Sequence, residues 1–181
     1  MMNKREGLPF KNINEPTKID VESKESDVFE FQVEGNKDMV YKELRNTDID
    51  YWKKVYEDVE SLENLASALK QTYEVLKEYL GDNLVDTHFV IANNRNNEPT
   101  ILKVQAKING KRIVDLEPEE ITQDIIDQQE SIWARVQEAE DDQRLDKLKF
   151  HVEYAQYRLG EATLKENQII NESGSVKVID W

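Results

Sequence analysis

The sequence predicts an α+β protein in which antiparallel strand pairs are separated by helices. Apolar residues alternate with polar ones in "VFEFQV" and in "MVYKEL", and the turn-forming stretch "EGNKD" lies between them. Such alternation is typical of half-buried strands. Between Trp52 and Leu80 the apolar residues instead recur every three or four positions, which indicates helix.

Composition excludes several classes of protein. The 181 residues carry a net charge of -14, and the acidic balance argues against binding to the phosphate backbone of nucleic acids. The absence of cysteine excludes disulfides, thiolate metal sites and cysteine nucleophiles. No apolar run is long enough for a signal peptide or a membrane span, so we expect a cytoplasmic protein.

The N-terminal elements follow from turn and strand signals. Residues 1–17 are polar and contain Pro9 and Pro16, so we expect a flexible arm. A short strand is predicted at residues 18–21. The hairpin of "VFEFQV" and "MVYKEL" follows it.

The helical segment admits two interpretations. Thr47 or Asp48 is expected to cap it, and Gly81 ends it. One or two helices could pack an apolar stripe against the core, or the stripe could form a coiled-coil seam with a partner or a second copy. The stripe consists of Trp52, Val55, Val59, Leu62, Ala66, Leu69, Tyr73, Leu76 and Leu80.

The remaining elements complete the prediction. "THFVI" and "TILKVQAKI" form a hairpin around an asparagine-rich turn. Pro118 then marks the predicted start of a helix whose apolar face includes Ile125 and Ile132. A second helix spans the apolar positions from Leu145 to Leu159. The final hairpin, "QIINESG" and "VKVID", turns at Ser173 and Gly174.

This order of elements, with four stretches of residues, resembles the protein-kinase-like superfamily, including its aminoglycoside-phosphotransferase branch. The stretches are "MVYKEL", "YEVLKEYLGDNLVDTHFVI", "TILKVQAKINGKRIVDL" and "NQIINESGSVKVID". The resemblance covers residues 18–181. It implies an N-lobe over residues 18–108, with a five-stranded antiparallel sheet and one helix. It also implies a curtailed helical C-lobe over residues 109–181 that carries a two-stranded hairpin.

The resemblance implies an ATP site in the N-lobe. Lys42 would contact the phosphates, because one ammonium group can bridge two of them. Glu74 would pair with Lys42 and orient it, with Glu60 and Glu63 as alternatives. The base would lie against the end of the fifth strand and bind through backbone groups of Val104, Gln105, Ala106 and Lys107.

The resemblance also implies a magnesium site in the last hairpin. Asn167 and Asp180 match the asparagine and aspartate that hold Mg²⁺ in kinases. The stretch "VIDW" is similar to the segment of many aminoglycoside-phosphotransferase-like proteins that corresponds to the D-F-G motif of other kinases. The chemistry is consistent, since Mg²⁺ is a hard cation that takes oxygen ligands beside nucleotide phosphates.

Departures from the family pattern limit the expected activity. Ala162 occupies the position of the catalytic aspartate, and Glu161 beside it is the one candidate base. The "ESKESD" stretch, where the phosphate-covering loop belongs, has no glycine, and the sequence ends at Trp181 before an acceptor-binding region.

Three functions therefore remain open from the sequence. The first is an ATP- and Mg²⁺-binding kinase-like protein with weak or absent phosphotransfer, in effect a pseudokinase. The second is a non-catalytic interaction or dimerisation module that uses the 52–80 stripe. In the third, a second chain completes the C-lobe and restores a kinase.

Overall fold

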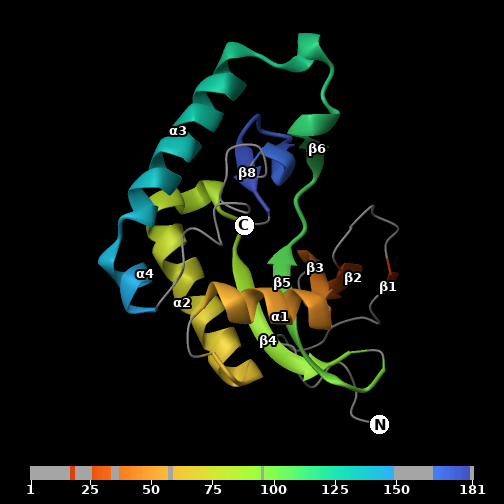
Figure 1. Ribbon diagram of the computed structural model, residues 1–181. Coiled ribbons are helices and arrows are strands. Elements are labelled where there is room, and N and C mark those ends of the chain that lie inside the picture. The colour runs from red at the N-terminus through yellow and green to blue at the C-terminus, as the bar shows by residue number, and fades with distance from the viewer. Residues whose placement is uncertain are drawn as a thin grey trace. The chain divides into compact units, whose positions relative to one another are not determined.

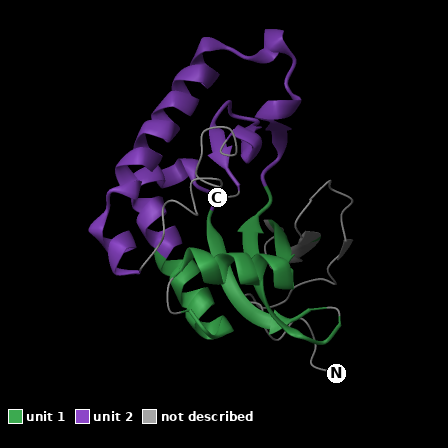
Figure 2. Cartoon of the chain, in the orientation of Figure 1, with its two compact units in different colours: residues 1–71, 86–107 green, residues 72–85, 108–181 purple. Residues whose placement is uncertain are grey.

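The α+β class is confirmed by the computed structural model, which describes residues 17–18, 26–33, 37–56, 59–94, 96–148 and 165–179. The chain divides into two compact units, shown in different colours in Figure 2. The first unit comprises residues 1–71 and 86–107, and the second comprises residues 72–85 and 108–181. The unit boundaries thus assign residues 72–85, which the sequence analysis placed with 18–108, to the second unit.

The first unit is built on an antiparallel sheet with the strand order β1-β2-β3-β5-β4 (Figure 1). Its strands are β1 (Thr17–Lys18), β2 (Ser26–Val33), β3 (Lys37–Leu44), β4 (Thr87–Asn93) and β5 (Pro99–Ala106). Both predicted hairpins, β2–β3 and β4–β5, are confirmed. The first strand covers Thr17 and Lys18, whereas the prediction of residues 18–21 extends into positions outside the described residues.

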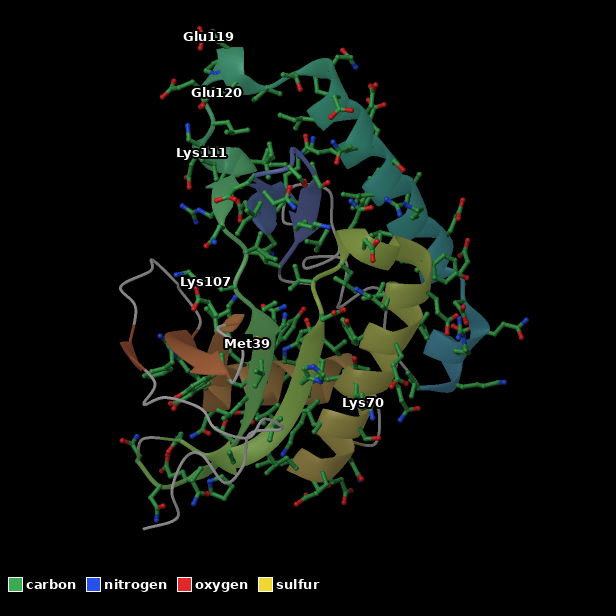
Figure 3. All side chains as sticks on the ribbon, turned by 180° about the vertical axis from the view of Figure 1, so that it is seen from behind. Met39, Lys70, Lys107, Lys111, Glu119 and Glu120 are labelled. Atoms are coloured by element: carbon green, nitrogen blue, oxygen red, sulfur yellow. The ribbon has the colours of Figure 1, made fainter. Side chains whose placement is uncertain are left out.

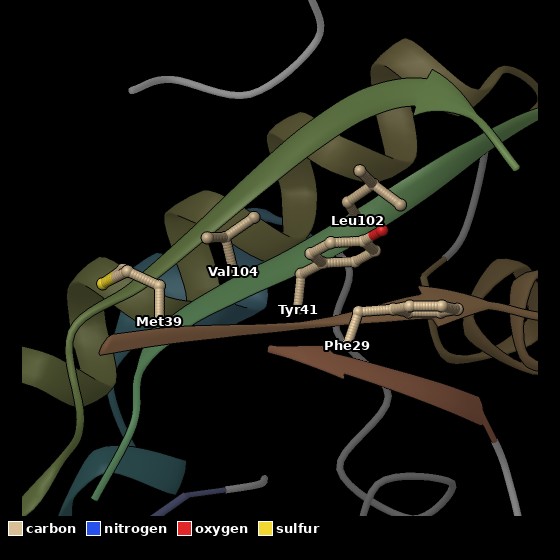
Figure 4. Close-up of a cluster of buried hydrophobic side chains, with 5 residues drawn as sticks. All are labelled: Phe29, Met39, Tyr41, Leu102 and Val104. Atoms are coloured by element: carbon tan, nitrogen blue, oxygen red, sulfur yellow. The ribbon is translucent and has the colours of Figure 1, made fainter. Parts of the chain in front are cut away.

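An apolar cluster on one face of this sheet fixes the strand register. The ring of Phe29 stacks on that of Tyr41, with the centroids 4.9 Å apart, and these two residues are directly opposite each other on β2 and β3. A slip of one residue would turn every side chain to the other face, so the buried cluster specifies the pairing. Its members, shown in Figure 4, are Phe29, Met39, Tyr41, Leu102 and Val104.

The helical segment forms two helices, α1 (Asn46–Val55) and α2 (Leu62–Leu80). Helix α1 begins before the predicted cap: Arg45 is the N-cap residue, and its backbone N–H donates to the Asp48 carboxylate over 3.0 Å. Because α1 ends at Val55, the 52–80 stripe is not one continuous helical seam. Its residues are buried at Trp52, Val55, Leu69, Leu76 and Leu80 and half-buried at Val59, Leu62, Ala66 and Tyr73.

The second unit contains a smaller antiparallel sheet with the order β6-β7-β8. The predicted hairpin is present as β7 (Gln168–Asn171) and β8 (Val176–Val178). The sequence analysis missed β6 (Gly110–Arg112), which pairs with β7, so the expected two-stranded hairpin is a three-stranded sheet.

Helices and short 3₁₀ turns complete the second unit. Pro118 begins a turn, η3 (Pro118–Glu120), and not the long helix as predicted. That helix, α3 (Gln123–Glu140), starts after Thr122, whose hydroxyl accepts from the Ile125 N–H over 3.4 Å. The other elements are the C-terminal part of α2, η1 (Gly81–Asn83), η2 (Ile113–Asp115) and α4 (Gln143–Lys147).

Two further expectations are decided only in part. Of the predicted helix from Leu145 to Leu159, the structure describes only the beginning, which lies in α4, since residues 149–164 are outside the described part of the chain. Residues 1–16, for which a flexible arm was expected, are outside it as well. Among the described helices, none combines the length and apolar composition that a bilayer crossing requires.

Gly110 allows β6 to approach β7 closely. A Cβ atom built at this position would lie 1.9 Å from the main-chain oxygen of Ile170, far inside van der Waals contact. The obstacle is backbone and cannot move aside as a flexible side chain would. Gly174 differs, since it has a φ of +80° but nothing within 4 Å of an added Cβ.

We predict that Gly110→Ala destabilises the protein more than Gly174→Ala does. The clash forces β6 away from β7 and should cost roughly 2–4 kcal/mol, whereas left-handed strain at Gly174 should cost about 1–2 kcal/mol. Urea unfolding followed by circular dichroism measures both changes. Equal losses in the two variants would show that the close approach of the strands carries no particular energetic weight.

Candidate functional site

Lys42 lies in the middle of β3, on the sheet face opposite the apolar cluster. Successive side chains of a strand point to opposite faces, and the preceding residue, Tyr41, belongs to that cluster. The side chain of Lys42 is half-buried. Its direct cross-strand neighbours are Val28 on β2 and Lys103 on β5. Lys42 is therefore not a freely solvated strand lysine, which was the alternative to a phosphate-binding role.

The glutamates proposed to orient Lys42 all lie on exposed positions. Glu74 is in the part of α2 that belongs to the second unit, while Lys42 belongs to the first. Glu60 precedes α2 and Glu63 lies in its first turn, and both are in the first unit with Lys42. The structure describes each unit by itself, so the pairing of Lys42 with Glu74 stays a prediction.

The segment predicted to contact a nucleotide base is engaged within the sheet. Val104 and Gln105 pair with β3 on one side and with β4 on the other. Ala106 pairs with Met39, and the backbone N–H of Lys107 donates to the Asp38 oxygen over 3.0 Å. Figure 3 shows Lys107 at the end of β5.

This pairing bears on the expected mode of base binding. The backbone groups of Val104 and Gln105 are engaged by both neighbouring strands, whereas Ala106 has a partner on the β3 side only. Val104 is in the apolar cluster, and the Gln105 amide donates to the Thr87 hydroxyl over 2.8 Å. Binding of a base along residues 104–107 stays a prediction.

Asn167 lies at the start of the β7–β8 hairpin and is half-buried. Its main-chain oxygen accepts a hydrogen bond from the Ile179 N–H over 2.9 Å, which continues the ladder one step past Gln168 and Val178. Asn167 is thus joined to the residue that immediately precedes Asp180. Asp180 itself lies outside the described residues, as do Glu161 and Ala162.

The donor types of the two expected ligands suit Mg²⁺. The side-chain amide of Asn167 and the carboxylate of Asp180 offer hard oxygen ligands, and Mg²⁺ commonly combines one or two of these with water and substrate phosphates. Among the described residues, no group of three or more His, Asp or Glu side chains forms a separate metal-binding cluster.

The hairpin turn is held by the Asn171 side chain. Its oxygen accepts from the backbone N–H groups of Ser173 and Ser175 over 3.1 and 2.8 Å, and from the Ser173 hydroxyl over 2.8 Å. Gly174 supplies the left-handed residue of the turn. The turn therefore sets the register that places Asn167 opposite Ile179.

A second support for the hairpin comes from Arg135 on α3. Its guanidinium donates to the Tyr79 and Leu80 main-chain oxygens at the end of α2, over 3.4 and 3.2 Å, and to the Asn83 side-chain oxygen over 2.8 Å. The Asn83 amide in turn donates to the Val176 oxygen of β8 over 2.7 Å. The sequence analysis missed this network, since no local pattern links residues so far apart.

Charged groups with shifted pKa values gather around Arg144. Its guanidinium binds both oxygens of Glu78 over 2.8 and 2.7 Å and also contacts Asp142, whose pKa its hydrogen bonds hold far below the usual range. The hydrogen bond to Asp142 raises the pKa of Tyr79. Arg144 and Glu78 are exposed, Asp142 and Tyr79 are partly buried, and the groups satisfy one another, so we interpret the cluster as structural and not catalytic.

Comparisons with known proteins add no assignment. No protein-family model matches the chain. No curated protein matches its sequence either. The functional interpretation therefore depends on the residues and geometry described above.

We predict that Arg135→Gln lowers the free energy of unfolding by about 1.5–3 kcal/mol, because it removes charge-assisted hydrogen bonds to the end of α2 and to Asn83. Lys111→Gln is the matched control, since it removes the exposed ion pair with Glu120, which is worth about 0–1 kcal/mol. Urea unfolding measures both. A loss in Lys111→Gln as large as that in Arg135→Gln would contradict the importance of the Arg135 network.

Proposed function

We propose that the protein binds ATP together with Mg²⁺ as a kinase-like protein whose phosphotransfer is weak or absent. The observation that carries the proposal is the hydrogen bond between the Asn167 oxygen and the Ile179 N–H. It fixes the proposed metal-binding asparagine opposite the residue before Asp180. A pair of hard oxygen ligands at one end of a hairpin is a suitable partner for a metal–triphosphate complex.

The arrangement of the first unit supports the same proposal. A helical segment lies between β3 and β4 in the chain, as the resemblance to kinase-like proteins implies, although it forms two helices, α1 and α2, instead of one. Lys42 lies on β3, the strand on which the resemblance expects a phosphate-binding lysine, and faces away from the apolar cluster. Finer statements, such as a kinase-like N-lobe and C-lobe, belong to this proposal.

The proposed roles follow from the chemistry of each group. Lys42 contacts the phosphates, and Glu74 orients Lys42, with Glu60 and Glu63 as alternatives. Asn167 and Asp180 hold Mg²⁺, which would neutralise charge between the phosphates. Ala162 cannot accept a proton from an attacking hydroxyl group, so phosphotransfer depends on a base from elsewhere, such as Glu161.

The interaction-module alternative gains little support from the 52–80 stripe. Five of its nine residues are buried within the chain itself, and the stripe is divided between two helices. A dimer or a partner chain that completes the second unit stays a prediction, which sedimentation over a dilution series would test.

We predict that millimolar ATP raises the melting temperature only in the presence of Mg²⁺. A ligand present at a hundred times its dissociation constant adds about 2.7 kcal/mol to the stability of the folded state. Asp180→Ala and Asn167→Ala should abolish the shift. Asn167→Ala is a clean variant because the hydrogen bond from Ile179 goes to the main-chain oxygen, which alanine retains.

Glu172→Ala is the matched control, since Glu172 is an exposed carboxylate in the turn of the same hairpin. It should keep the Mg²⁺-dependent shift. ATP turnover is measured on the same samples and should be slow or undetectable. Absence of any shift in the wild type would refute the proposal, and fast turnover that survives Asp180→Ala would place the chemistry elsewhere.

A further inference from the structure

The dipeptide Asn109–Gly110 lies where the chain enters β6. Lys107 and Lys111, which are labelled in Figure 3, precede and follow it. It is the only Asn-Gly pair in the sequence. An asparagine reacts with its own backbone when the main-chain nitrogen of the next residue attacks the side-chain amide. Glycine in that next position favours the attack, because it has no side chain that crowds the nitrogen.

The side chain of Asn109 is exposed and makes no hydrogen bond to the residues that the structure describes. Asn171, on the opposite strand, differs in this respect. Its side-chain oxygen accepts from the backbone N–H groups of Ser173 and Ser175 over 3.1 and 2.8 Å. The Asn109 amide can therefore turn toward its own backbone, whereas the Asn171 amide is held in the hairpin turn.

The backbone N–H of Gly110 is not used by the pairing of β6 with β7. Gly110 is the register partner of Asn171. The Asn171 N–H donates to the Ser175 oxygen over 3.0 Å, so it points toward the β8 side and not toward β6. Opposite residues of an antiparallel pair alternate between hydrogen-bonded and non-bonded positions, and Gly110 therefore occupies a non-bonded one. Because β6 ends the strand order β6-β7-β8, the Gly110 N–H faces the outer edge of the described sheet.

We propose that Asn109–Gly110 is a site of spontaneous backbone modification, independent of the function proposed above. The Gly110 nitrogen attacks Cγ of Asn109, so a new C–N bond forms and the bond from Cγ to the amide nitrogen breaks. The Gly110 proton passes to hydroxide, and the departing amide group takes a proton from water and leaves as ammonia. Water then opens the resulting succinimide ring at either carbonyl carbon, which gives aspartate or, chiefly, isoaspartate. No reactant other than water is needed.

Isoaspartate would disturb β6 because it inserts the Cβ atom of residue 109 into the main chain. A Cβ atom added at Gly110 would lie 1.9 Å from the Ile170 oxygen, so the backbones of β6 and β7 are already in close contact. At the other end of β6, the buried Ile113 fixes the chain. The longer main chain cannot be taken up by sliding the strand, since a slip changes the face of every side chain. We therefore expect the modification to loosen the pairing of β6 with β7.

The test of the reaction is incubation of the folded protein at neutral and at mildly alkaline pH, followed by peptide mass spectrometry. Electron-transfer fragmentation distinguishes isoaspartate from aspartate. We expect Asn109 to react faster at the higher pH, and at a rate within about tenfold of that in urea, because no strand has to open first. Asn171 is the internal control and should stay intact in the folded protein. Asn109→Gln should abolish the reaction, since the longer side chain closes a ring far more slowly.

A rate in the folded protein that is about a hundredfold or more below the rate in urea would overturn the proposal, because the fold would then protect Asn109. The effect on β6 is measured on the isoaspartate form, which ion exchange separates by its added negative charge. This form should unfold at a lower urea concentration than Asn109→Asp, which carries the same charge on an ordinary main chain. Equal unfolding midpoints would overturn the loosening of β6.

Discussion

The second unit depends on the guanidinium group of Arg135. The last turn of an α-helix leaves carbonyl oxygens without intrahelical partners, and the helix dipole makes a cation favourable there. Arg135 donates to two of these oxygens in α2 and, through Asn83, reaches the main chain of β8. A backbone bond from Val85 to Val178 reinforces the same junction. One side chain on α3 therefore connects the end of α2 to the hairpin on which Asn167 lies.

In the first unit the corresponding constraint is the central position of β5. Every residue from Thr100 to Gln105 is buried, so this strand has neighbours on both faces as well as on both edges. Its backbone is consumed by the ladders to β3 and β4. Val104 and Gln105 therefore commit their backbone groups to the sheet on both sides, and the role of β5 that the structure shows is to join β3 to β4.

Local patterns predicted much of the fold, and long-range contacts account for what they missed. Alternation identified β2 and β3, two apolar runs around an asparagine-rich turn identified β4 and β5, and the serine–glycine turn identified the last hairpin. Strand β6 carries only exposed residues, so it has no apolar signal, and its pairing depends on the space at Gly110. Pro118 suggested a helix start, but Thr122 supplies the capping hydroxyl. At the site, Lys42 and Asn167 could be chosen from the sequence. The Arg135 network could not, because it joins residues from α2, α3 and β8 that are far apart in the sequence.

Compensation of charge takes two forms in this chain. Around Arg144, opposite charges meet with short hydrogen bonds, and stability is a sufficient explanation. Lys103 lies in the centre of β5 with only 5% of its surface exposed, opposite Lys42 on β3. Both lysines interact with other groups of the chain. Lysine is almost never buried to this extent unless its charge is compensated, so the groups that hold Lys103 are part of what keeps the first unit folded.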